Sequence, residues 1–143
     1  MSLDPETRSN TVVYRIEKAK KTWDDALFCI EGKRWNMASN RLYYAVFHAV
    51  SALLISNNIP ANTHRGFLRQ MNFHLINNKK LMTPEEGQLV RQLFGMRHED
   101  DYEDFIDITE EQIKEYLPRV QNLIDKLIRI TTTATTDNPQ DSI

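Results

Sequence analysis

Three polar residues that can do chemistry lie on an otherwise apolar helix. Arg41, Tyr44 and His48 are three and four residues apart within the run Asn40–Leu54, so their side chains project from one stripe of the helix. Because the neighbouring residues are apolar on nearly every side, this helix must be buried and its polar side chains need partners. In a structural role, each finds a partner inside the protein. In a functional role, they line a groove that binds a phosphate or a nucleotide.

A second polar cluster follows where a later helix should end. This cluster, Arg97, Asp101 and Tyr102, could bind a phosphate. A guanidinium donates hydrogen bonds to phosphate oxygens, a nearby carboxylate orients the guanidinium, and a phenol donates a further hydrogen bond. The helix dipole alone also favours an arginine at a helix C-terminus. His64, at the start of a shorter helix, either caps that helix or faces the same groove. We expect the two clusters to converge and form one small pocket.

The sequence contains no pattern typical of a metal site, a cofactor site or a nucleophilic triad. The acidic run from Glu99 to Asp107 lacks the loop glycine and the ligand spacing of an EF-hand, which favours a solvated loop. We therefore expect neither a metal nor a cofactor. The single Cys29 excludes an internal disulfide and packs as a buried thiol, for which a reducing cytoplasm is the natural location.

The overall charge argues against generic coating of nucleic acid. The chain has 18 Lys and Arg residues and 20 Asp and Glu residues, which gives a formal charge of -2. Such a chain has no global attraction to a polyphosphate, although a local basic patch is compatible with these numbers. We expect no DNA partner. No apolar run approaches the roughly 18 residues that a membrane span requires, so we expect no membrane association.

Apolar residues recur at helical spacing in five segments of the chain. These segments cover about residues 10–30, 34–57, 63–76, 83–97 and 109–128. The chain is therefore predicted to be all-α, as an antiparallel up-and-down four-helix bundle with the third segment as an additional short helix. We expect a single domain over residues 10–130, with a flexible segment at 1–9 and a disordered Thr-rich tail at 131–143.

Three motifs occur in order along the chain: Asn40–Leu54, Thr63–Phe67, and Arg97 followed by Asp101 and Tyr102. Together they resemble the HEPN superfamily, in particular its short, stand-alone prokaryotic members. The resemblance implies an antiparallel helical bundle that is frequently a homodimer. It also implies a gene often encoded beside a minimal nucleotidyltransferase, with the two proteins acting as a toxin and antitoxin pair.

Many HEPN proteins are metal-independent ribonucleases, and the resemblance implies a motif for that activity. In it, an Arg stabilises charge on the phosphate, and a His that follows after four to six residues transfers a proton. After Arg97, the positions where that His would fall hold Tyr102 and two acidic residues. The pair Arg41 and His48 has the required spacing, but it lies on a different helix.

The sequence leaves three functional hypotheses open. The preferred one is a dimeric partner of a nucleotidyltransferase that binds nucleotide or RNA phosphate through the two polar clusters. The second is a toxin endoribonuclease that uses Arg91 with His98, which also has the required spacing, or Arg97 with Tyr102. The third is a helical adaptor whose polar residues only satisfy one another.

Overall fold

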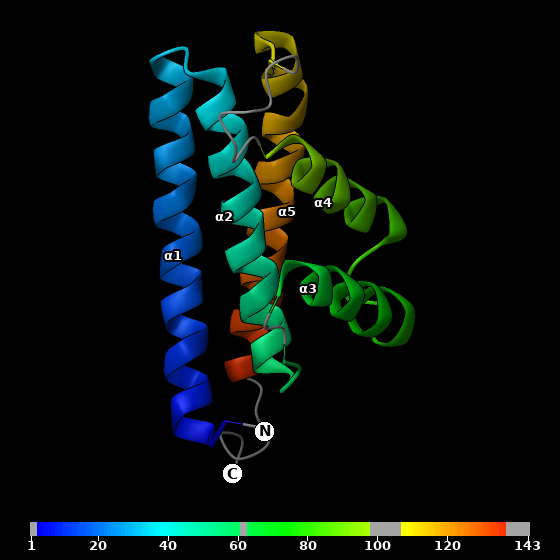
Figure 1. The fold of residues 1–143 in the computed structure, drawn as a ribbon. Helices are drawn as coiled ribbons and strands as arrows, with labels where there is room; N and C mark the ends of the chain where they lie inside the picture. Colours follow the sequence, from blue (N-terminus) through cyan, green and yellow to red (C-terminus); the bar gives the residue numbers. More distant parts are fainter. Residues whose placement is uncertain (1–2, 61–62, 98–106, 137–143) are drawn as a thin grey trace.

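The computed structural model describes residues 3–60, 63–97 and 107–136, and every regular element in these three ranges is a helix (Figure 1). The helices are α1 (Pro5–Glu31), α2 (Trp35–Ser56), α3 (His64–Gln70), the π-helix η1 (Met71–Asn78), α4 (Pro84–Met96) and α5 (Glu110–Thr136). Because η1 follows α3 without an intervening residue, the two form one continuous arm. The all-α helical bundle predicted from the sequence is confirmed.

α2 is the centre of the bundle because its side chains are apolar around the whole helix. Leu42, Tyr43, Val46 and Leu53 have no exposed surface. α1 and α5 pack against α2 on two sides, so three long helices lie side by side (Figure 1). The burial of most of α2 agrees with its near-continuous apolar sequence.

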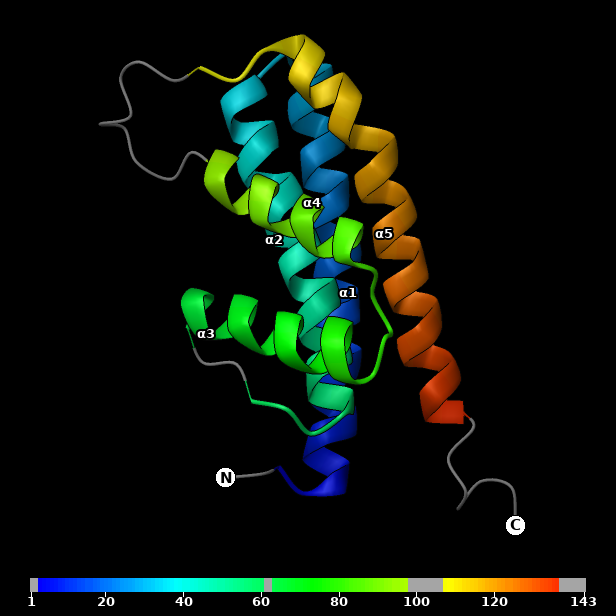
Figure 2. The same ribbon diagram turned by 90° about the vertical axis from the view of Figure 1, so that its right-hand side faces the viewer.

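The arm and α4 form a pair that crosses the long helices (Figure 2). Gly87 permits this pairing, since an added Cβ there would clash with Cδ1 of Ile76 on η1. The crossing pair returns the chain to the beginning of α2, where the backbone N–H of Ile108 donates to Oδ1 of Asn36 at 2.8 Å. α5 therefore runs in the same direction as α2.

The expected up-and-down order of four antiparallel helices needs correction on this point. α1 and α2 are antiparallel, but α5 is parallel to α2 and α4 belongs to the crossing pair (Figures 1 and 2). The sequence indicated the helices but not their directions. Direction depends on how far the connecting segment travels, and here two short helices carry the chain back along α2.

Two helices extend beyond the limits that the sequence predicted. α1 begins at Pro5, because Oδ1 of the N-cap Asp4 accepts a hydrogen bond from the backbone N–H of Thr7 at 2.9 Å. α5 continues to Thr136, and within this extension Thr131 is buried and donates its hydroxyl hydrogen to the carbonyl oxygen of Leu127 at 2.8 Å. Residues 5–9 and 131–136, expected to be flexible or disordered, are therefore helical.

The C-terminus of α1 has the left-handed turn that commonly ends a helix, one residue later than the glycine suggests. Gly32 is the C-cap with φ of -82°, whereas Lys33 adopts the left-handed conformation with φ of 59°. The backbone N–H of Lys33 donates to the carbonyl oxygen of Ile30 at 3.0 Å, and the backbone N–H of Arg34 donates to the carbonyl oxygen of Cys29 at 2.8 Å. These two bonds form the Schellman arrangement.

α4 begins with a capping box. The hydroxyl of Thr83 accepts a hydrogen bond from the N–H of Glu86 at 3.1 Å, and the carboxylate of Glu86 accepts one from the N–H of Thr83 at 2.8 Å. The same carboxylate accepts from Nζ of Lys126 at 2.8 Å. One residue thus caps α4 and attaches it to α5.

Candidate functional site

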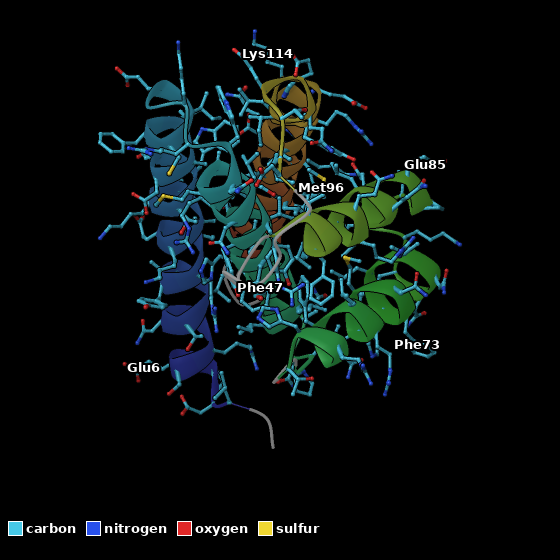
Figure 3. All side chains as sticks on the ribbon, turned by 45° about the horizontal axis from the view of Figure 1, so that its top comes forward. Glu6, Phe47, Phe73, Glu85, Met96 and Lys114 are labelled. Atoms are coloured by element: carbon cyan, nitrogen blue, oxygen red, sulfur yellow. The ribbon has the colours of Figure 1, made fainter. Side chains whose placement is uncertain are left out.

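The two halves of the candidate site meet at five rings, which we call the aromatic cluster: Tyr43, Tyr44 and Phe47 of α2, His64 of α3, and Phe94 of α4. The ring centroid of Tyr43 lies 5.0 Å from that of Tyr44 and 5.6 Å from that of Phe94. Phe47 lies on the side of α2 that faces the arm (Figure 3), and the ring centroid of His64 is 4.9 Å from its own. Tilted and edge-on ring pairs of this kind are electrostatically favourable.

A hydrogen bond between two rings fixes the start of α3 on α2. Oη of Tyr43 lies 2.7 Å from Nδ1 of His64, and the side chain of Tyr43 is fully buried. His64 follows the N-cap Thr63, whose hydroxyl accepts from the N–H of Gly66 at 2.9 Å. His64 therefore does not cap α3 through its own side chain. It packs in the aromatic cluster instead.

Three guanidinium groups from three helices lie against the aromatic cluster. The Cζ atom of Arg15 on α1 is 5.7 Å from the ring centroid of Phe47. That of Arg41 on α2 is 5.3 Å from Tyr44, and that of Arg97, the C-cap of α4, is 3.9 Å from Phe94. Cation–π contacts hold an arginine in place without neutralising its charge.

His48 is bonded to one of these arginines and is held neutral. Nη1 of Arg15 lies 3.0 Å from Nδ1 of His48, and since an arginine can only donate, Nδ1 accepts and the ring proton is on Nε2. Burial lowers the pKa of His48 to about 4, with further lowering by the positive charges of Arg15, Lys18 and Arg41. This corner of the protein therefore has a positive potential.

The charges of Arg15 and Arg41 are not neutralised within the described ranges. No carboxylate there lies within ion-pairing distance of either guanidinium. Arg41 instead donates from Nε and Nη2 to Oδ1 of its neighbour Asn40, at 3.1 and 2.8 Å. Half-buried arginines held by rings and an amide are suited to bind an anion such as phosphate.

The residues predicted from the sequence are brought together in part. Arg41, Tyr44, His48 and His64 lie in or beside the aromatic cluster, and Arg97 reaches the same cluster from α4. Nη1 of Arg97 also donates to the carbonyl oxygen of Phe94 at 2.7 Å. The two arginines expected to converge thus contact two rings, Tyr44 and Phe94, that both pack against Tyr43.

Other predicted residues lie elsewhere. Arg91 is exposed on α4, and none of the ring or hydrogen-bond contacts within the described ranges joins it to the aromatic cluster. His98, Asp101 and Tyr102 lie outside the described residues, so their roles stay predictions.

Sequence reasoning missed Arg15. A signal for it exists, because Arg15 follows Val12 by three residues and precedes Ala19 by four, and both of these residues are buried. An arginine on the buried stripe of a helix must meet a polar or aromatic partner. Here those partners are His48 and Phe47.

Two open grooves run along α5, away from the aromatic cluster. One, of about 490 Å³, lies between α1 and α5 and is lined by Trp23, Ile124 and Ile128 among others. The other, of about 540 Å³, lies between α4 and α5 and contains the Glu86–Lys126 ion pair. Their charged side chains are of both signs, so neither groove selects an anion as the cluster of arginines does.

The described part of the chain has neither a metal site nor a membrane-spanning helix. There, no group of three His, Cys, Asp or Glu side chains could hold a metal ion. No helix in the same ranges combines the length and the apolar character needed to cross a bilayer.

The fold and the site define a small helical protein that presents arginines beside a partly buried aromatic cluster. The model of the HEPN domain family matches residues 12–130. This match spans most of the chain, including every residue of the aromatic cluster. The chain therefore belongs to the HEPN family.

Curated relatives match the chain over much of their own length. It is 27% identical over 123 residues to a "UPF0332 protein" of Thermotoga maritima, a match that covers 86% of this chain and 92% of that protein. It is 26% identical over 114 residues to "Putative toxin MJ0605" of Methanocaldococcus jannaschii, covering 78% and 82%. A second protein of that organism with a toxin name, MJ0142, is 29% identical over 102 residues, covering 71% and 68%.

Proposed function

We propose that this HEPN protein binds the phosphate of a nucleotide or of RNA at the aromatic cluster and acts as a dimeric partner of a minimal nucleotidyltransferase. The observation that supports phosphate binding is the convergence of Arg15, Arg41 and Arg97 on one set of rings. Their guanidinium groups come from three different helices. An anion is bound well by several cations that face one site, and Arg15 of α1 reaches this site through contacts with His48 and Phe47 of α2.

The state of His48 supports the same proposal. Its neutral ring accepts a hydrogen bond from Arg15, so it holds that guanidinium in place and leaves its positive charge uncancelled. Burial is the main cause of its lowered pKa, and the positive charges of Arg15, Lys18 and Arg41, which lower it further, also attract a phosphate. Tyr43, buried and bonded to His64, fixes the floor of the site.

The test is to measure binding and stability separately for single substitutions. Arg15→Gln and Arg41→Gln should each weaken the binding of AMP and of a short single-stranded RNA by about tenfold, since each removes one charge-assisted contact. Arg119→Gln serves as the control, because it also removes one positive charge but lies on α5 in an exposed ion pair with Glu115. Unchanged affinity in both site variants, with normal thermal unfolding, contradicts the proposal.

Partnership with a nucleotidyltransferase is supported by the family and by the toxin names of two relatives. The test is to co-express the chain with a nucleotidyltransferase encoded beside it and to measure the mass of the purified complex. We expect the chain to purify alone as a dimer of its 16.8 kDa unit and to form a larger complex with the partner. A chain that stays monomeric and does not retain the partner contradicts this part of the proposal.

A metal-independent toxin ribonuclease is the second candidate, favoured by the relatives named as toxins. In that role, Arg97 stabilises charge on the phosphate undergoing cleavage. The test is to incubate the protein with total RNA in the presence of a chelator, alongside Arg97→Ala and His98→Ala variants. Cleavage that disappears in the Arg97 variant supports the nuclease. Intact RNA, or equal cleavage by the native protein and the variant, excludes it.

A further inference from the structure

Acidic residues are missing from a long internal stretch of the chain. Between Glu31 and Glu85 the sequence contains no Asp or Glu, although the whole chain carries 20. The basic residues of this stretch are Lys33, Arg34, Arg41, Arg65, Arg69, Lys79 and Lys80. The formal charge of -2 thus conceals a strong separation of charge along the chain. Separation of this kind points to an anionic partner for the basic part.

The structure concentrates part of this charge on the arm formed by α3 and η1. Arg65 and Arg69 lie on the arm, Lys79 and Lys80 follow it directly, and all four side chains are exposed. No carboxylate within the described ranges lies at ion-pairing distance from any of them. The arm crosses α2 and extends beyond the long helices, so its outer face is open to a partner (Figures 1 and 2).

An aromatic ring and an amide continue the line of the two arginines. Arg65, Arg69, Phe73 and Asn77 follow one another at intervals of four residues, so they lie close to one stripe of the arm. Phe73 is 59% exposed and lies on the part of the arm remote from α1 (Figure 3). Its ring centroid is 4.8 Å from that of His74, which holds the ring in position. Within the α-helical part, at about 1.5 Å per residue, Arg65 and Arg69 lie roughly 6 Å apart along the axis.

This sequence of groups fits a single-stranded nucleic acid better than other anionic partners. Two guanidiniums about 6 Å apart along the helix contact successive phosphates, an exposed ring stacks on a base, and an amide bonds to a base edge. A membrane-surface helix would expose an apolar face. Here the apolar face of the arm is buried, since Phe67, Met71 and Leu75 have no exposed surface.

We propose that the outer stripe of the arm, formed by Arg65, Arg69, Phe73 and Asn77, binds single-stranded RNA. The same RNA strand then continues to the arginines beside the aromatic cluster. The arm begins at His64, whose ring is bonded to Tyr43 and packs on Phe47, so the stripe and the site are contiguous. The part of this proposal that concerns the cluster rests on the proposed function. The RNA contact of the arm itself does not.

The test compares a variant that loses two positive charges on the arm with a variant that loses two positive charges elsewhere. The arm variant is Arg65→Gln with Arg69→Gln, and the control is Lys114→Gln with Arg119→Gln on α5, both exposed. Binding is measured by fluorescence anisotropy with a labelled single-stranded RNA of about 12 nucleotides, over about 50 to 200 mM salt. Phe73→Ala is measured in the same way.

The arm variant should lower RNA affinity and reduce the slope of log affinity against log salt by roughly 1.4, because each phosphate contact contributes about 0.7 on a single strand. Phe73→Ala should weaken binding by about fivefold or more through lost stacking, with the slope unchanged. The control should keep both the affinity and the slope of the native protein. Equal slopes in the arm variant and the native protein overturn the proposal.

Two further measurements identify which idea fails. AMP is too small to reach from the cluster to the outer stripe, so the arm variant should bind AMP as the native protein does. If Arg41→Gln leaves RNA and AMP binding unchanged while the arm variant loses RNA, the proposed function fails and the arm proposal stands. If the arm variant binds anionic phosphatidylglycerol vesicles or polyglutamate more weakly but RNA equally well, the arm recognises a different class of partner and the proposal is overturned.

Discussion

Lowering the pH should destabilise this protein through His48 specifically. The folded protein keeps the ring neutral, because burial and the neighbouring positive charges lower its pKa from 6.5 to about 4. In the unfolded chain the ring has its ordinary pKa and takes up a proton first as the pH falls. Between about pH 6.5 and pH 4 the unfolded state therefore binds more protons, and the free energy of unfolding decreases as the pH is lowered.

The size of the effect follows from the pKa difference. At 1.36 kcal/mol per pKa unit, a group with these two pKa values loses roughly 2 kcal/mol of stability by about pH 5. The ring of His48 is only partly buried, so solvent screening reduces the expected loss to about 1 kcal/mol. In urea, this corresponds to a midpoint lower by about 0.5 M.

Urea unfolding followed by circular dichroism at about pH 7.5 and pH 5 measures this loss. The comparison is with His48→Gln, because the glutamine oxygen can still accept the hydrogen bond of Arg15 but does not titrate. Other groups titrate in both proteins and cancel in the difference. The native protein should lose about 1 kcal/mol more than the variant over this pH interval. Equal losses in the two proteins would refute the argument that His48 is buried neutral beside Arg15.

Three further predictions concern stability. Gly87→Ala should lower the free energy of unfolding by about 1 to 3 kcal/mol in urea unfolding, because the added methyl group overpacks against Ile76. Ile76→Val should relieve that loss in the double variant, because it removes Cδ1. Additive effects of the two substitutions would contradict the contact. Lys33→Gly should raise the free energy of unfolding by about 1 kcal/mol in urea unfolding, since φ of 59° is unfavourable for a side chain and suits glycine. An unchanged free energy would contradict this reasoning. Thr83→Ala should lower the melting temperature through loss of about 1 kcal/mol of capping, while Thr83→Ser should not.

Much of the fold could be predicted from the sequence because it depends on residues close together in the chain. The helices follow from apolar periodicity, and the capping box of α4 joins residues only three apart. The same holds for the stripe of Arg41, Tyr44 and His48, which the geometry of a helix places on one side. Local rules are sufficient wherever the interacting groups belong to one helix.

The sequence by itself determined an all-α chain with a buried central helix that carries unusual polar residues. Only the tertiary structure decided that α5 runs parallel to α2, that Arg15 reaches His48 across 33 residues of sequence, and that His64 bonds to Tyr43. It also decided that the basic residues of the arm lie on an open face. These features depend on where the crossing pair directs the chain, and that direction is fixed by packing between distant segments, which no local pattern records.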